Sequence, residues 1–241
     1  MRVFRRAFAS AEISVCFSQG FNPHPRLSFG PSLRTGWEGC DEYMDMLLEV
    51  PADDLSLRCN RYLPEGLQIL EAAAADVSVP KLAADVTGAR YDIHLDETDV
   101  FKCPLGAQKP LLEKVAEKTP VNGPSWKARV LEELAAAVGE RFSGEQVSSE
   151  VRDAGGLAGT PLILEVQCER LEDDTATPVK VQFFSTMHGG RSLFPEDILA
   201  PLLGEPTGYV TPIRVVRTSL YVERGGRYIS PISRAALENR T

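Results

Sequence analysis

The sequence predicts an α+β protein made of two tandem ferredoxin-like units, each a split βαβ motif, with the first unit lacking its opening strand. Three observations lead to this fold class. Segments with helix and strand periodicity follow the order α-β-β-α-β over residues 1–75 and β-α-β-β-α-β over residues 89–230. The 241 residues are enough for two cores. A hydrophobic fraction of 43% and a charged fraction of 25% are those of a globular protein.

The first half begins with a helical pattern over residues 2–11, where apolar residues recur about every four positions. The β-branched run ISVCF (13–17) and the alternating run EYMDMLLEV (42–50) predict two strands. A second helix is expected over 51–63, because a proline followed by two aspartates suits a helix N-terminus. The run LQILEA (67–72) predicts the last strand of this unit.

The missing opening strand has a physical consequence. In a split βαβ motif the first and third strands are the central pair, so without the first strand the last one has no neighbour. We therefore expect an open slot in the first sheet, or a slot filled by another segment. We also expect that Met1 is an internal methionine of a longer natural chain.

The second unit follows an Ala-rich linker at 76–88 and precedes a tail at 231–241. Alternating apolar patterns predict four strands, and apolar residues at i, i+4 and i+8 or a proline followed by acids predict two helices. The expected strands are 90–95, 161–171, 178–187 and 211–223, and the expected helices are 126–142 and 194–204.

Several classes of protein are not supported. No apolar run reaches the roughly 18–20 residues that span a bilayer, and the N-terminus lacks the apolar region of a secretory signal, so we expect a cytoplasmic protein without membrane contact. The five cysteines form no C-x-x-C pair and the three histidines are dispersed, so we expect neither a metal nor a cofactor. Cys16 and His24 lack an orienting acid, and we assign no catalytic residue.

The charge is distributed unevenly along the chain. Residues 1–40 carry a net charge of +3 and residues 210–241 a net charge of +4, which leaves −15 for the residues between them because the total is −8. Both ends use arginine and no lysine, and arginine is suited to binding phosphate. If the ends meet, they form a basic face for a nucleic acid or an acidic protein. Solvated charges on separate surfaces explain the pattern equally well.

The loop FSQGFNPHPRLSFG (17–30), part of a long excursion at 18–39, is the main candidate site. Its prolines restrict the backbone around a histidine, its phenylalanines are possible stacking platforms, and its arginine suits phosphate. We expect an ordered loop with at least one buried phenylalanine, and with His24, Arg26 and Arg34 in solvent on one face. Buried phenylalanines and a histidine that caps the backbone are the structural alternative.

A weaker candidate is HGGRSLFPEDIL (188–199), where a Gly-Gly pair and an arginine precede an expected helix start that suits an anion. An ordinary capped turn has the same residues. The complete set of candidate binding residues is Gln19, Phe21, Asn22, His24, Arg26, Arg34, Arg191, Arg214 and Arg217.

The run SQGFNPHP, followed by LSF and the strand that begins Glu42-Tyr43, resembles a bacterial family of unknown function that is linked to radical-SAM proteins. A weaker similarity extends through GGRSLFPEDILAPLLG and IRVVRTSLY. The resemblance implies a partner, a cobalamin-binding-type radical-SAM protein that stands beside such chains or is fused to them. Two departures are the start of the chain inside the first helix and the sequence SSEVRDAGGLAGT in place of a basic stretch.

We therefore expect a non-catalytic accessory module that binds RNA or a ribonucleoprotein and works with a radical-SAM partner. An adaptor that docks on that partner without touching nucleic acid is a second hypothesis. An RNA-modifying enzyme of the pseudouridine-synthase type is a third, although that class needs a catalytic aspartate and the candidate loop has none.

Overall fold

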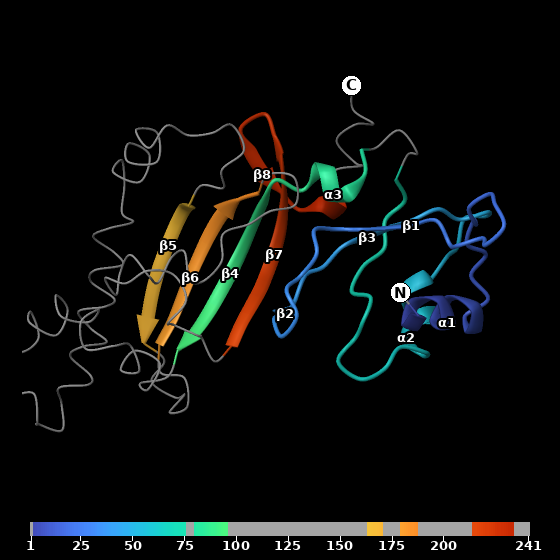
Figure 1. Ribbon diagram of the computed structural model, residues 1–241, viewed down its shortest axis with the longest axis horizontal. Coiled ribbons are helices and arrows are strands. Elements are labelled where there is room, and N and C mark those ends of the chain that lie inside the picture. Colours follow the sequence, from blue (N-terminus) through green and yellow to red (C-terminus); the bar gives the residue numbers. More distant parts are fainter. Residues whose placement is uncertain (1, 76–79, 96–162, 171–178, 188–213, 234–241) are drawn as a thin grey trace, which may run out of the picture.

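The computed structural model describes residues 2–75, 80–95, 163–170, 179–187 and 214–233 (Figure 1). These residues form an α+β fold with short helices and mostly antiparallel strands, as the sequence predicts. The expected helices at 126–142 and 194–204 lie outside the described residues.

The larger sheet is built mainly from the second half of the chain. Its strands follow the order β2-β7-β4-β6-β5, and β8 pairs with β7 as a hairpin. All of these pairs are antiparallel except the β2–β7 pair, which is parallel. The strands are β2 (Glu38–Gly39), β4 (Gly88–Leu95), β5 (Ile163–Arg170), β6 (Val179–Thr186), β7 (Arg214–Arg224) and β8 (Arg227–Ile229). The four strands expected in this half are therefore confirmed.

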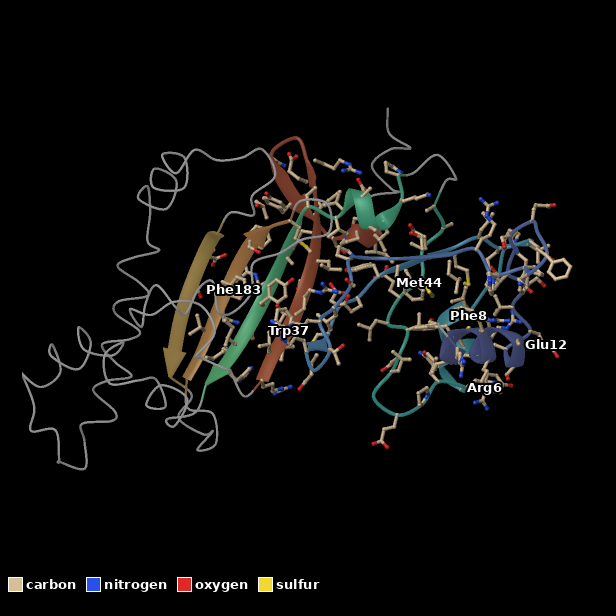
Figure 2. All side chains as sticks on the ribbon, in the orientation of Figure 1. Arg6, Phe8, Glu12, Trp37, Met44 and Phe183 are labelled. Atoms are coloured by element: carbon tan, nitrogen blue, oxygen red, sulfur yellow. The ribbon has the colours of Figure 1, made fainter. Side chains whose placement is uncertain are left out.

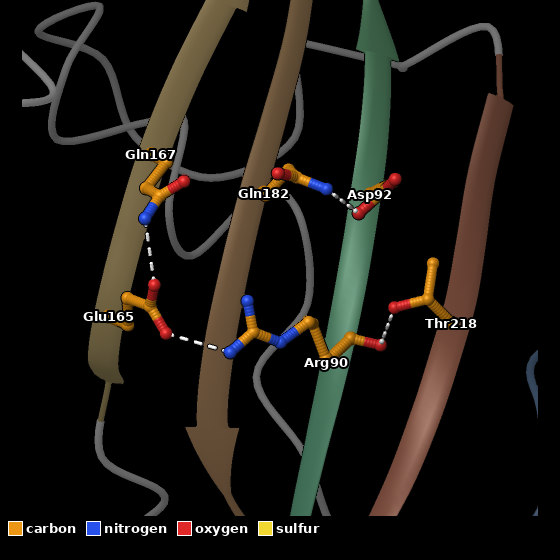
Figure 3. Close-up of polar contacts among 6 residues, drawn as sticks. All are labelled: Arg90, Asp92, Glu165, Gln167, Gln182 and Thr218. Atoms are coloured by element: carbon orange, nitrogen blue, oxygen red, sulfur yellow. Dashed lines mark hydrogen bonds and ion pairs between the residues drawn. The ribbon is translucent and has the colours of Figure 1, made fainter.

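The two faces of this sheet differ in polarity. Alternate residues of β4, namely Ala89, Tyr91 and Ile93, are buried on one face. The other face is polar (Figure 3): Arg90 donates to Glu165 at 2.8 Å, and Gln182 donates to Asp92 at 2.9 Å. These cross-strand contacts join β4 to β5 and to β6, so they favour the observed register.

The first half of the chain forms a smaller layer. Helices α1 (Arg2–Ser10) and α2 (Leu55–Asn60) pack with the hairpin-like pair β1 (Leu27–Phe29) and β3 (Met44–Met46). Phe8 of α1 and Met44 of β3 belong to one hydrophobic cluster, whereas Arg6 points away from it (Figure 2). Arg58 of α2 donates to the carbonyl of Ala11 at 2.6 Å, which satisfies the C-terminal end of α1.

Three expectations for this half need correction. The segment 13–17 forms isolated bridges, Val15 with Leu48 and Phe17 with Pro25, and no continuous strand. Helix α2 begins at Leu55 because Asp54 is left-handed, with a φ of 52°, and interrupts the helix expected from residue 51. The strand expected at 67–72 is absent. A strand needs a neighbour for its backbone groups; here the Asn60 side chain supplies the partner instead, accepting from the Ile69 N–H at 2.8 Å and donating to its carbonyl at 2.9 Å.

Two further elements lie in segments expected to be linker and tail. Helix α3 (Leu82–Asp85) precedes β4, and the 3-10 helix η1 (Pro231–Ser233) follows β8. Leu82 is buried, and Arg224 of β7 donates to both carboxylate oxygens of Asp85 at 2.8 and 2.9 Å. The segment that precedes β4 is therefore packed against the sheet.

Candidate functional site

Residues 18–24 form a closed turn, here called the tip loop. The Ser18 N–H donates to the carbonyl of His24 at 2.8 Å, and the His24 N–H donates to Ser18 Oγ at 3.0 Å. The bridge between Phe17 and Pro25 continues this pairing at the base of the loop. Gly20 has a φ of 135°, a conformation that suits glycine. The backbone of the loop is thus held by its own hydrogen bonds and prolines.

The side chains of the tip loop point into solvent. Phe21 is completely exposed, and Gln19, Asn22 and His24 are exposed as well. Arg26, just beyond the loop, is also exposed. An exposed aromatic ring among amides, an imidazole and a guanidinium is a suitable surface for a planar or anionic group.

The expectation of a buried phenylalanine in this region is wrong. Phe17 is 50% exposed, Phe21 is completely exposed, and Phe29 is 36% exposed with its ring centroid 6.1 Å from that of Phe4. The region is ordered by backbone pairing instead: β1 pairs with β3, and the Arg26 N–H donates to the Cys16 carbonyl at 2.8 Å. Backbone hydrogen bonds therefore keep this region ordered, which the sequence analysis had expected a buried phenylalanine to do.

Arg34 lies at a different place from the tip loop. Its guanidinium carbon is 6.0 Å from the centroid of Trp37, whose ring meets Tyr91 edge-on at 5.9 Å. Tyr91 in turn stacks on Phe183 at 5.0 Å. Trp37 and Phe183 lie at the large sheet (Figure 2), whereas the tip loop is at the opposite end of the view (Figure 1). His24 and Arg26 are therefore not brought together with Arg34, although all three reach solvent.

The two candidate arginines of β7 are engaged in ion pairs. Arg214 donates to both carboxylate oxygens of Glu38 at 2.9 and 2.7 Å, which lowers the pKa of that carboxyl, with a smaller contribution from the charge of His94. Arg217 is 1% exposed; it donates to both oxygens of Glu42 at 2.7 and 2.5 Å and to the Pro31 carbonyl at 2.8 Å. The guanidinium of Arg217 is thus inaccessible to a partner, and Arg191 lies outside the described residues.

The basic ends of the chain are not joined into one face by the described residues. Helix α1, with its exposed arginines 2, 5 and 6, lies with the tip loop at one end of the view, and β7 lies at the large sheet (Figure 1). Among the described residues no group of three potential metal ligands is found. Likewise, no helix in the described part of the chain is long and apolar enough to cross a membrane.

Two residues that sequence reasoning did not select connect the candidate loop to the sheet. Glu42 and Trp37 come from the second part of the 18–39 excursion and its exit, and they contact β7 and β4. Trp37, between Gly36 and Glu38, could have predicted a contact between this loop and the rest of the fold, because a large aromatic side chain usually packs against other apolar groups.

Residues 1–139 match the model of a family described as an uncharacterized protein conserved in bacteria (DUF2344), so the match spans more than half of the chain. No curated protein matches the sequence.

Proposed function

The chain belongs to the bacterial DUF2344 family, and we propose that it is a non-catalytic module whose tip loop binds single-stranded RNA. The observation that carries the proposal is the complete exposure of Phe21 at the apex of a hydrogen-bonded loop. An apolar ring in water has no stabilising role in its own fold. A nucleic-acid base can stack on such a ring, and stacking is worth about 1–3 kcal/mol per base.

The neighbouring groups support RNA as the ligand class. Gln19 and Asn22 carry amides that can pair with base edges, and Arg26 can contact a phosphate. The exposed arginines of α1 lie at the same end of the molecule (Figure 1) and add positive charge there. The net charge of −8 does not oppose this, because residues 1–40 alone carry +3.

The fold class that we propose is finer than the described α+β architecture. We infer that the second half is a ferredoxin-like unit, because its strands follow the order β7-β4-β6-β5 with antiparallel neighbours. In chain order these are the fourth, first, third and second strands, the order of a split βαβ motif. A ferredoxin-like unit also has two helices on one face of its sheet, and in this proposal they cover the face of Tyr91 and Ile93. An experimental structure of the protein tests whether they do.

A radical-SAM protein is the proposed partner, and the resemblance of SQGFNPHP and the Glu42-Tyr43 strand supports it. Co-purification of the tagged chain from a native host, followed by identification of both the bound protein and the bound RNA, tests the partner. Recovery of the radical-SAM protein without RNA would favour the adaptor hypothesis over the RNA-binding module.

The RNA proposal is tested by the binding of a fluorescent 12-nucleotide oligouridine at several salt concentrations. We expect the affinity to fall as salt rises, because phosphate contacts release counterions. Phe21→Ala should weaken binding about tenfold or more at every salt concentration, since it removes a stacking contact. Leu57→Ala on α2 is the control, because Leu57 is also exposed, at 60%. Absence of binding at low salt, or an equal effect of both variants, would refute the proposal.

A further inference from the structure

The outer face of α1 carries three arginines, and the helix contains no acidic residue. Arg2, Arg5 and Arg6 are exposed. Ala7 and Phe8, on the opposite face, are buried in the core. Because residues three and four apart lie on one side of a helix, the three side chains form a single row, here called the arginine stripe. Figure 2 shows Arg6 of this stripe pointing away from Phe8.

The positive charge of the stripe is not neutralised by the described part of the chain. Among the residues that the structure describes, none forms an ion pair with an arginine of the stripe. Arg2 also lies beside Arg5 at i+3 and Arg6 at i+4, and like charges at these spacings destabilise a helix. The stripe therefore opposes the folding of α1, and an anionic ligand would remove the repulsion.

The arginines of β7 show the contrast. Arg214, Arg217 and Arg224 each donate to a carboxylate of the fold. The charges of these arginines are thus compensated within the protein, whereas the arginine stripe leaves its charges to solvent or to a ligand.

Hydrogen bonds fix the stripe relative to the tip loop. Residues 11–17 connect the two, and a chain of this length spans at most about 30 Å. Arg58 holds the start of this connection by donating to the Ala11 carbonyl at 2.6 Å. Its other end is held by the Cys16 N–H, which donates to the Leu47 carbonyl at 2.8 Å. The stripe and the tip loop are therefore two parts of one preformed surface at the same end of the molecule (Figure 1).

We propose, on the basis of the RNA-binding function above, that the arginine stripe binds the phosphate backbone of the same RNA strand whose base stacks on Phe21. The ligand is then a single strand that passes from the tip loop onto the outer face of α1. Guanidinium groups bind phosphate oxygens through forked pairs of hydrogen bonds, so a row of arginines suits a chain of phosphates. Residues 2–26 carry four arginines and one acid, Glu12, which leaves this surface positive.

The first test compares two lengths of RNA on the unmodified protein. Oligouridines of 3 and 12 nucleotides are titrated, and the backbone amides are followed by NMR. Both strands should shift the amides of residues 18–24, whereas only the longer strand should also shift those of α1. A 12-nucleotide strand that shifts the tip loop alone would overturn this inference and leave the proposed function intact.

The second test removes charge from the stripe. Arg5→Gln/Arg6→Gln should weaken the 12-nucleotide strand about tenfold or more at low salt, and should lower the slope of log affinity against log salt by about 1.4, which corresponds to two phosphate contacts. Its affinity for the 3-nucleotide strand should not change. Arg5→Lys/Arg6→Lys should retain most of the affinity, because lysine binds phosphate as a point charge.

Lys81→Gln/Arg227→Gln is the matched control, since it removes two exposed cations beside the large sheet and changes the net charge equally. It should alter the affinity for either strand by less than about twofold, because neither cation contacts the strand in this proposal. The Arg5→Gln/Arg6→Gln variant should also melt no lower than the unmodified chain, since it removes repulsion within α1. A lower melting temperature would show that these arginines stabilise the fold, against the inference.

The remaining outcomes distinguish the stripe from the tip loop. If Arg5→Gln/Arg6→Gln loses no more affinity than the matched control does, the stripe does not bind RNA, and weaker binding by Phe21→Ala still supports the tip loop. If Arg5→Gln/Arg6→Gln weakens both strand lengths equally, α1 contacts the same nucleotides as Phe21 and the longer path is wrong. If Phe21→Ala binds both strands as well as the unmodified chain does, the proposed function and this inference are both refuted.

Discussion

Arg217 and Glu42 form a two-bonded ion pair that joins β7 to the start of the β3 segment across 175 residues of sequence. The partners are buried unequally, because the Arg217 side chain is 2% exposed and the Glu42 side chain is 38% exposed. Burial alone would lower the pKa of Arg217, but the hydrogen bonds and charge of Glu42 raise it above its ordinary value. The guanidinium is therefore charged in the folded protein and depends on Glu42 for compensation.

Because Arg217 is more deeply buried than Glu42, we expect the loss of Glu42 to lower stability more than the loss of Arg217. Glu42→Ala leaves a buried cation without its counter-ion and should lower the free energy of unfolding by about 3 kcal/mol or more. Arg217→Met keeps most of the apolar packing and leaves a carboxylate that water can reach, so its loss should be smaller, about 1–2 kcal/mol. Urea unfolding followed by circular dichroism measures both changes.

The exposed pair of Arg214 and Glu38 supplies the control for that comparison. Glu38→Ala should change stability by less than about 1 kcal/mol, because exposed ion pairs contribute little. If Glu42→Ala is as mild as Glu38→Ala, or milder than Arg217→Met, the buried pair does not hold the loop to the sheet.

Gly88 should not tolerate a side chain. A Cβ at this position would lie 2.9 Å from Cζ of Phe184 and 3.1 Å from the Tyr228 ring, and these rings pack edge-to-face at 4.8 Å. Gly88→Ala should therefore lower the unfolding free energy by about 1–3 kcal/mol through overpacking. Gly30→Ala is the matched variant, since its nearest contact would be 3.4 Å. Similar melting temperatures for the two variants would show that the aromatic cluster moves freely.

The phenol of Tyr43 should lose its proton at a higher pH than an ordinary tyrosine does. Its pKa is raised to about 12, mainly by burial; the neighbouring Asp41 contributes to the rise, and the hydrogen bond with Ser230 acts in the opposite direction. Because the folded pKa lies above the unfolded value of 10.0, the neutral phenol stabilises the fold fully below pH 10. That contribution is lost as the pH rises from about 10 towards about 12.

NMR titration of the tyrosine Cζ resonances measures this pKa, with Tyr43→Phe used to assign the signal. Asp41→Asn should lower the midpoint, since it removes a negative charge and an accepting carboxylate. A midpoint near 10 in the unmodified protein would show that burial does not raise the pKa of Tyr43.

The parts of the fold that could be predicted from sequence are those governed by local periodicity. Alternation along Ala89, Tyr91 and Ile93 marks β4, and alternation along Val181 and Phe183 marks β6, because the side chains of one strand alternate between a buried and a polar face. Helix α1 follows from apolar residues that recur every four positions.

Long-range contacts could not be predicted in this way. Nothing in the residues around Glu38 shows that β2 adds to β7 in parallel, or that Arg217 points inward to Glu42, because these contacts join distant parts of the chain. The basic residues of β7 therefore had the composition of a binding surface but mostly form internal ion pairs. By contrast, the exposure of His24 and Arg26 followed from a loop rich in proline and glycine.

The tip loop and β1 allow stability and binding to be separated, which is the last prediction. Phe29→Ala should lower the unfolding free energy by about 1 kcal/mol, because the ring contacts Phe4 but is still 36% exposed. The double variant His24→Ala/Arg26→Ala should leave stability nearly unchanged, since both side chains are exposed and the bonds between Ser18 and His24 use only the backbone of His24.

The same double variant should weaken oligouridine binding severalfold and reduce its salt dependence by about one phosphate contact, which Arg26 supplies in the proposal. Thermal unfolding and fluorescence anisotropy on the same preparations make the comparison direct. If the double variant unfolds the protein, His24 or Arg26 packs within the fold. If the double variant is stable but binds RNA as well as the unmodified chain does, His24 and Arg26 do not contact RNA. Weaker binding by Phe21→Ala would then show that the tip loop contacts RNA through other residues, and unchanged binding would show that it makes no contact.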